Sequence, residues 1–131
     1  IAGTSANLMF TDNIFNGVSN GTFGSTNNAV FYYGSFMVVD GLTIKDNTFN
    51  NGSYCTYLNG SSGNLSDNLL IEGNTTTGTL SGGFRGGYWK NITVIGNDIT
   101  AATNSTSQYG VYFYGSGSSP NTRAIIKENV I

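Results

Sequence analysis

The sequence predicts an all-β solenoid, a right-handed single-stranded parallel β-helix of about four coils with a partial fifth. Three observations predict this fold: one strand-length segment recurs along the chain, apolar and polar residues alternate within it, and an Asn recurs at the same place in each copy. We expect a single domain over 1–131 that is a fragment of a longer β-helix. Its coils are expected at about 7–40, 41–67, 68–90, 91–122 and 123–131, the last of them partial.

The recurring segment reads NLMFTDNIF at 7–15 and GLTIKDNTF at 41–49, and later copies lie at 68–76, 91–99 and 123–131. Its shared residue, at spacings of 34, 27, 23 and 32, is Asn13, Asn47, Asn74, Asn97 and Asn129. Such irregular spacing indicates coils whose strands are fixed and whose loops vary in length. At a bend an Asn can adopt the left-handed conformation, and stacked Asn amides hydrogen-bond to one another. We therefore expect a structural Asn ladder.

Because side chains alternate across a strand, every second residue of each copy faces the interior. The three inward rows are mainly aliphatic and aromatic: Leu8, Leu42, Leu69, Ile92 and Ala124; Phe10, Ile44, Ile71, Val94 and Ile126; Phe15, Phe49, Thr76, Ile99 and Ile131. A second strand recurs at 29–35, 55–61, 83–89 and 110–116. Its predicted inward residues are Val30 and Tyr32, Thr56 and Leu58, Phe84 and Gly86, and Val111 and Phe113.

Composition excludes several classes of function. Charged residues make up 9% of the chain, the net charge is −2, and the five basic residues are scattered, so no nucleic-acid partner is expected. No apolar run approaches the roughly 20 residues of a membrane span, and we expect no membrane insertion. With no His and one Cys, catalytic Ser-His-Asp or Cys-His sets, zinc sites and disulfides are excluded within the chain. We expect neither metal nor cofactor.

The repeat resembles that of the pectate-lyase-like right-handed parallel β-helix superfamily, over essentially the whole chain. That superfamily includes polysaccharide lyases, epimerases, autotransporter adhesins and phage tailspikes, and the chain looks most like a tailspike or tail-fibre segment. The resemblance implies a rigid shaft in a virion or extracellular protein that contacts surface polysaccharide during host recognition. The alternatives are part of a polysaccharide hydrolase or lyase of the same fold, and a purely structural shaft or cell-surface adhesin passenger.

The outward positions of the repeated strand include Met9, Leu70 and Ile125 in one row. Several apolar residues on one sheet surface indicate that something covers it. Proteins of the tailspike type trimerise by packing β-helices side by side, so the resemblance implies a homotrimer.

The outward face of the second strand is the best candidate for a ligand surface. Its predicted members are Phe31, Tyr33, Tyr57, Asn59, Arg85, Tyr112 and Tyr114, with Trp89 nearby. Aromatic rings stack on the apolar faces of sugar rings, and amide and guanidinium groups pair with sugar hydroxyls, so these residues are predicted to bind glycan. The same residue types also suit a subunit contact, or merely favour a sheet surface.

Asp12 and Asp46 are the weak candidates for catalysis, because they occupy equivalent positions on consecutive coils just before the Asn. Two carboxyl groups about 5 Å apart are typical of retaining glycosidases. An Asp beside an Asn at a turn is, however, ordinary turn chemistry. The sequence therefore leaves enzymatic activity undecided, with a polysaccharide hydrolase or lyase as the expected class if there is one.

Overall fold

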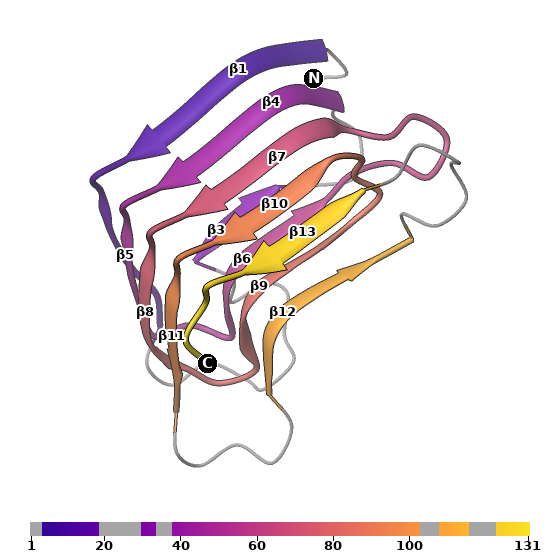
Figure 1. Cartoon of the computed structure of the whole chain (residues 1–131). Coiled ribbons are helices and arrows are strands. Elements are labelled where there is room, and N and C mark those ends of the chain that lie inside the picture. Colours follow the sequence, from indigo (N-terminus) through magenta and orange to yellow (C-terminus); the bar gives the residue numbers. More distant parts are fainter. Residues whose placement is uncertain (1–3, 19–29, 34–37, 103–107, 116–122) are drawn as a thin grey trace.

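The computed structural model describes residues 4–18, 30–33, 38–102, 108–115 and 123–131. The regular secondary structure of these residues consists of β-strands, and they contain no helix (Figure 1). The first sheet contains β1 (Thr4–Thr11), β4 (Val38–Lys45), β7 (Asp67–Glu72), β10 (Ile92–Ile95) and β13 (Ala124–Lys127). The second contains β2 (Ile14–Asn16), β5 (Thr48–Asn50), β8 (Thr75–Thr79) and β11 (Asp98–Ala101). The third contains β3 (Phe31–Tyr33), β6 (Tyr54–Asn59), β9 (Gly82–Gly87) and β12 (Tyr109–Tyr114).

The strand order shows how the chain is wound. Neighbours within every sheet are three elements apart in the chain, and all pairings between the named strands are parallel. The chain therefore visits the three sheets in turn and returns to each beside its previous strand, as Figure 1 shows for the stack from β1 to β13. The expectation of an all-β fold with stacked parallel strands is confirmed, and the arrangement is compatible with a β-helix or another solenoid.

The inward rows predicted for the repeated strand are found in register. Leu8 pairs with Leu42, Leu42 with Leu69, Leu69 with Ile92, and Ile92 with Ala124, and the row that begins at Phe10 continues in the same way. Members on the central strands are almost fully buried, as Ile44, Ile71 and Val94 are. The members on β13 are exposed because no described strand lies beyond it.

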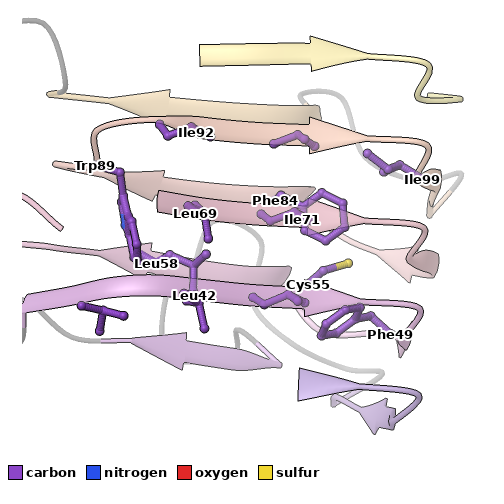
Figure 2. Close-up of a cluster of buried hydrophobic side chains, with 13 residues drawn as sticks. Leu42, Phe49, Cys55, Leu58, Leu69, Ile71, Phe84, Trp89, Ile92 and Ile99 are labelled. Atoms are coloured by element: carbon purple, nitrogen blue, oxygen red, sulfur yellow. The ribbon is translucent and has the colours of Figure 1, made fainter. Parts of the chain in front are cut away.

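The core lies between the three sheets and is formed by the inward side chains (Figure 2). Phe49 on β5 is fully buried, stacks on Phe15 with ring centroids 5.0 Å apart, and meets the edge of Phe84 at 6.3 Å. Cys55 is also fully buried, and burial raises the pKa of its thiol to about 12, although the neighbouring Thr76 side chain acts in the opposite direction. This thiol is consequently packed as an apolar group.

The five repeated Asn residues form a continuous hydrogen-bonded ladder. At each step the backbone N–H and the Nδ2 group of one Asn both donate to Oδ1 of the next, over distances of 2.9–3.1 Å. Asn74 also donates from Nδ2 to the backbone oxygens of Ile44 and Glu72. Because Asn47, Asn74 and Asn97 are about 99% buried, these bonds satisfy amides that water does not reach.

One detail of the expected ladder is wrong. The left-handed conformation belongs to the residue before each Asn, and not to the Asn itself: Asp12 (φ 58°), Asp46 (φ 53°), Gly73 (φ 64°), Gly96 (φ 65°) and Glu128 (φ 57°). The bend between the first and second sheets is thus made one residue earlier than expected. The Asn side chain that follows the bend lies along the stack and bonds to the adjacent coil.

Candidate functional site

The outer side of the third sheet carries a group of five aromatic and polar side chains, which we name the tyrosine–arginine face: Tyr57, Asn59, Arg85, Tyr112 and Tyr114. Tyr57 pairs with Arg85, and Arg85 with Tyr112. In the neighbouring row Asn59 pairs with Gly87, and Gly87 with Tyr114. These two rows across β6, β9 and β12 have the register that the sequence predicts.

The first strand of the third sheet departs from the predicted register by one residue. Phe31 pairs with Thr56, Tyr32 with Tyr57, and Tyr33 with Leu58. Phe31 and Tyr33 therefore share rows with interior residues of β6, while Tyr32, predicted to face inward, shares the row of Tyr57. A one-residue slip exchanges the two faces of a strand, and three consecutive aromatic residues contain no alternation that could reveal it.

Arg85 lies at the centre of the tyrosine–arginine face. Its guanidinium carbon is 5.0 Å from the ring centroid of Tyr54, 5.1 Å from that of Tyr57, 5.7 Å from that of Tyr112 and 5.9 Å from that of Tyr114. Nη1 donates a hydrogen bond of 2.5 Å to the hydroxyl of Tyr54. The electron-rich faces of the rings attract the cation.

Tyr114 on β12 is hydrogen-bonded to two residues of β6, Tyr57 and Asn59. Its hydroxyl donates to Asn59 Oδ1 at 2.8 Å and lies 3.1 Å from the hydroxyl of Tyr57, which must then be the donor of that bond. Burial raises the pKa of Tyr114 well above its usual range, and the charge of Arg85 opposes this shift only in part. The phenol thus stays protonated and remains a hydrogen-bond donor at neutral pH.

Further aromatic residues, which sequence reasoning missed, border the face. Tyr88 meets Tyr114 edge-on at 5.8 Å, and Tyr109 lies 5.0 Å from Tyr112. Tyr54 is only 3% exposed. Alternation counted back from inward Thr56 would place Tyr54 inside, so the pattern contained no signal for its contact with Arg85.

Trp89 was predicted beside this surface, and that prediction is wrong. The side chain is fully buried, belongs to the hydrophobic core, and donates from Nε1 to the backbone oxygen of Leu58 at 3.1 Å (Figure 2). Trp89 lies two residues beyond the end of β9, where alternation along that strand no longer specifies a side. An indole in this position stabilises the core and does not contact a ligand.

Asp12 and Asp46 are exposed and lie at the left-handed bend between the first and second sheets. They lie on consecutive coils, because the N–H of Asp12 donates to the backbone oxygen of Lys45, and Lys45 directly precedes Asp46. Neither belongs to the tyrosine–arginine face. Within the described ranges no three or more His, Cys, Asp or Glu side chains gather in a way that could hold a metal ion.

A cavity of about 260 Å³ lies between the last strands of the second and third sheets. It is lined by Ile99, Ala101, Gln108, Tyr109, Gly110 and Ile131. Its lining contains one amide, one phenol and no charged side chain.

No protein family, curated protein or solved structure matches this chain. Among the residues that the structure describes, there is no helix with the length and hydrophobicity needed to span a membrane.

Proposed function

We propose that the chain is a segment of right-handed single-stranded parallel β-helix, of about four coils and part of a fifth, in a protein of the phage tailspike or tail-fibre type. In this proposal it acts as a rigid shaft of a virion or cell-surface protein. Its tyrosine–arginine face contacts surface polysaccharide.

One observation carries the proposal: five side chains suited to sugar recognition converge on adjacent rows of a single sheet. Tyr112 is 40% exposed and presents a ring, while Arg85 and Asn59 present hydrogen-bond donors beside it. β6 and β9 are hydrogen-bonded to strands on both sides, and β12 is hydrogen-bonded to β9, so the sheet holds these groups in place. Binding then requires little ordering of the protein, which favours affinity.

Tyr112→Ala tests the proposal most directly, because its described contacts are with side chains of the face and its bordering tyrosine. Binding of purified lipopolysaccharide O-chains and capsular polysaccharides is measured by calorimetry for the wild type and the variant. We expect the Kd of the bound polysaccharide to rise about tenfold or more, as when an aromatic hot spot is removed. The matched control is Ile14→Ala, which removes a 70% exposed side chain from the second sheet and should leave binding unchanged.

A wild-type chain that binds no polysaccharide of the panel, or a Tyr112→Ala variant that binds like the wild type, contradicts the proposal. The same samples also separate binding from degradation. Release of reducing ends that disappears in Asp46→Asn would favour a polysaccharide hydrolase instead.

We also propose that shafts associate side by side as homotrimers through the outer side of the first sheet. Met9, Thr43, Leu70, Thr93 and Ile125 lie there in one register row, and Met9 is 68% exposed. Light scattering after gel filtration is expected to give a trimer mass for the wild type and a monomer mass for Leu70→Lys. Thr77→Lys, on the outer side of the second sheet, is the control and should leave the trimer intact.

A further inference from the structure

The charge of Arg85 is not neutralised by any carboxylate of the chain. All seven acidic residues lie in described parts of the structure, and the ion pairs found there are Lys45 with Glu72 and Lys127 with Glu128. The strands of the third sheet contain no Asp or Glu. Arg85 is thus a half-buried cation on a sheet without negative charge.

The tyrosine rings around Arg85 do not replace a counter-ion. The quadrupole of an aromatic ring attracts a cation that lies over its face, but the rings carry no net charge. Nη1 is occupied by Tyr54, whereas Nε is buried without a partner. Nη2 has no hydrogen-bond partner among the described residues and is not fully buried, so its hydrogens remain for a ligand.

The neighbouring polar groups also supply donors. The Oδ1 atom of Asn59 already accepts from Tyr114, which leaves the Nδ2 group of Asn59 as the part of this amide that can donate outward. Arg85 Nη2 and Asn59 Nδ2 therefore offer hydrogens on one face. A group that only accepts hydrogen bonds and carries negative charge is the chemical complement of such a site.

We infer that the tyrosine–arginine face selects saccharides with an anionic substituent, which binds at Arg85. This inference rests on the proposed function and specifies its substrate class. A carboxylate and a phosphate or sulfate ester share the required chemistry. The sugar ring that bears the anionic group lies against Tyr112, while the guanidinium of Arg85 forms a charge-assisted hydrogen bond with the group.

The test compares matched acidic and neutral ligands on the whole chain. One pair is a glucuronic acid-containing capsular polysaccharide before and after carboxyl reduction, and the other is dextran sulfate and dextran. We expect the wild type to bind the acidic member of at least one pair about tenfold more tightly, as one charge-assisted hydrogen bond can provide. The pair that shows the preference identifies carboxylate or sulfate as the group recognised.

Three variants locate the preference at Arg85. Arg85→Met removes the charge but keeps an apolar chain between the rings, and it should bind the acidic and neutral members equally. Arg123→Met makes the same change of net charge at an exposed site outside the third sheet and should keep the preference. Asn59→Asp introduces a carboxylate of nearly the same shape on the same face, and should abolish the preference even if Arg85→Met does not fold.

The outcomes separate this inference from the proposed function. Equal binding of acidic and neutral ligands by the wild type would overturn the inference and leave glycan binding intact. A preference that persists in Arg85→Met and Asn59→Asp, or that is lost equally in Arg123→Met, would also overturn it. If none of the ligands or panel polysaccharides binds, both proposals fail.

Discussion

Tyr114 reaches across Gly87 to hydrogen-bond Asn59, although the two residues lie on strands that are not neighbours. A Cβ atom at Gly87 would be 2.7 Å from the nearest ring carbon of Tyr114, so only glycine leaves room for this ring. Gly87, at the end of β9, thus allows a side chain of β12 to reach β6. This hydrogen bond holds together the row of the tyrosine–arginine face that contains Asn59 and Tyr114.

Gly87→Ala should displace the Tyr114 ring and break its bonds with Asn59 and Tyr57. We expect the free energy of unfolding to fall by about 1–3 kcal/mol, measured by urea denaturation with the fluorescence of Trp89, the single tryptophan, as the signal. Gly63→Ala is the control, because a Cβ there would meet no atom within 4 Å, and its effect should stay within about 0.5 kcal/mol. Equal unfolding midpoints for the two variants would contradict the proposed role of Gly87.

Asn74→Ala should remove the centre of the Asn ladder. The backbone N–H of Asn47 and the backbone oxygen of Ile44 would lose buried hydrogen-bond partners, so we expect a loss of about 3 kcal/mol or more in the free energy of unfolding. Asn50→Ala is the matched control, since within the described residues the side-chain amide of Asn50 bonds to Asn16 alone, on an outer surface. Similar losses in thermal or urea unfolding would show that the ladder does not stabilise the stack.

Alanine substitutions at two glycines of the left-handed bend, which have nearly the same φ, should lower the free energy of unfolding by different amounts. Gly73→Ala and Gly96→Ala should each lose about 1–2 kcal/mol from backbone strain. Gly73→Ala should lose more, because its Cβ would collide with the carboxylate of Asp46, whereas a Cβ at Gly96 meets no atom within 4 Å. Urea unfolding in an Asp46→Gly background tests this steric cause: the difference between the two alanine variants should disappear there.

The stability of the chain should fall at alkaline pH because of Cys55. The pKa of its thiol is about 12 in the folded chain and has an ordinary value of 9.0, so the unfolded chain loses this proton first. The free energy of unfolding should be unaffected by this group below pH 9 and should then fall towards pH 12, by up to about 1.4 kcal/mol per pH unit. Cys55→Ala should make the fall shallower in urea titrations between pH 8 and 11. Parallel curves for wild type and variant above pH 9 would contradict this prediction.

The register of the first sheet could be predicted from the sequence because two independent signals agree there. Alternation of apolar residues sets which face is inward, and the Asn sets the position along the strand, so Leu42, Leu69 and Ile92 were aligned correctly. In β3 neither signal exists: Phe31, Tyr32 and Tyr33 are all aromatic, and no Asn marks the phase. The alignment there depended on the Gly-Ser that closes the segments at 29–35 and 55–61, and it slipped by one residue.

The sequence did not predict the contacts in which a side chain extends over a neighbouring strand, such as those of Arg85 with Tyr54 and of Tyr114 with Asn59. Periodicity places Tyr57, Arg85 and Tyr112 in one row, but it contains no information on whether a ring can lie over a neighbouring strand. The bend before each Asn was open to prediction, because Gly at 73 and 96 occupies two of its five positions. A repeated position that holds Gly in some copies and Asp in others is typical of a backbone that adopts the left-handed conformation.

The ladder of amides is also directional. Each of the first four ladder residues donates to its successor in the chain. Among the described residues, Oδ1 of Asn13 therefore accepts from no other ladder member, and Asn129 donates to the backbone oxygens of Val94 and Lys127. The aligned amides add their dipoles along the axis and polarise one another in a single sense. The stack therefore has a direction, and an Asn on any coil stacked before Asn13 would have to donate to Asn13 Oδ1 in the same sense.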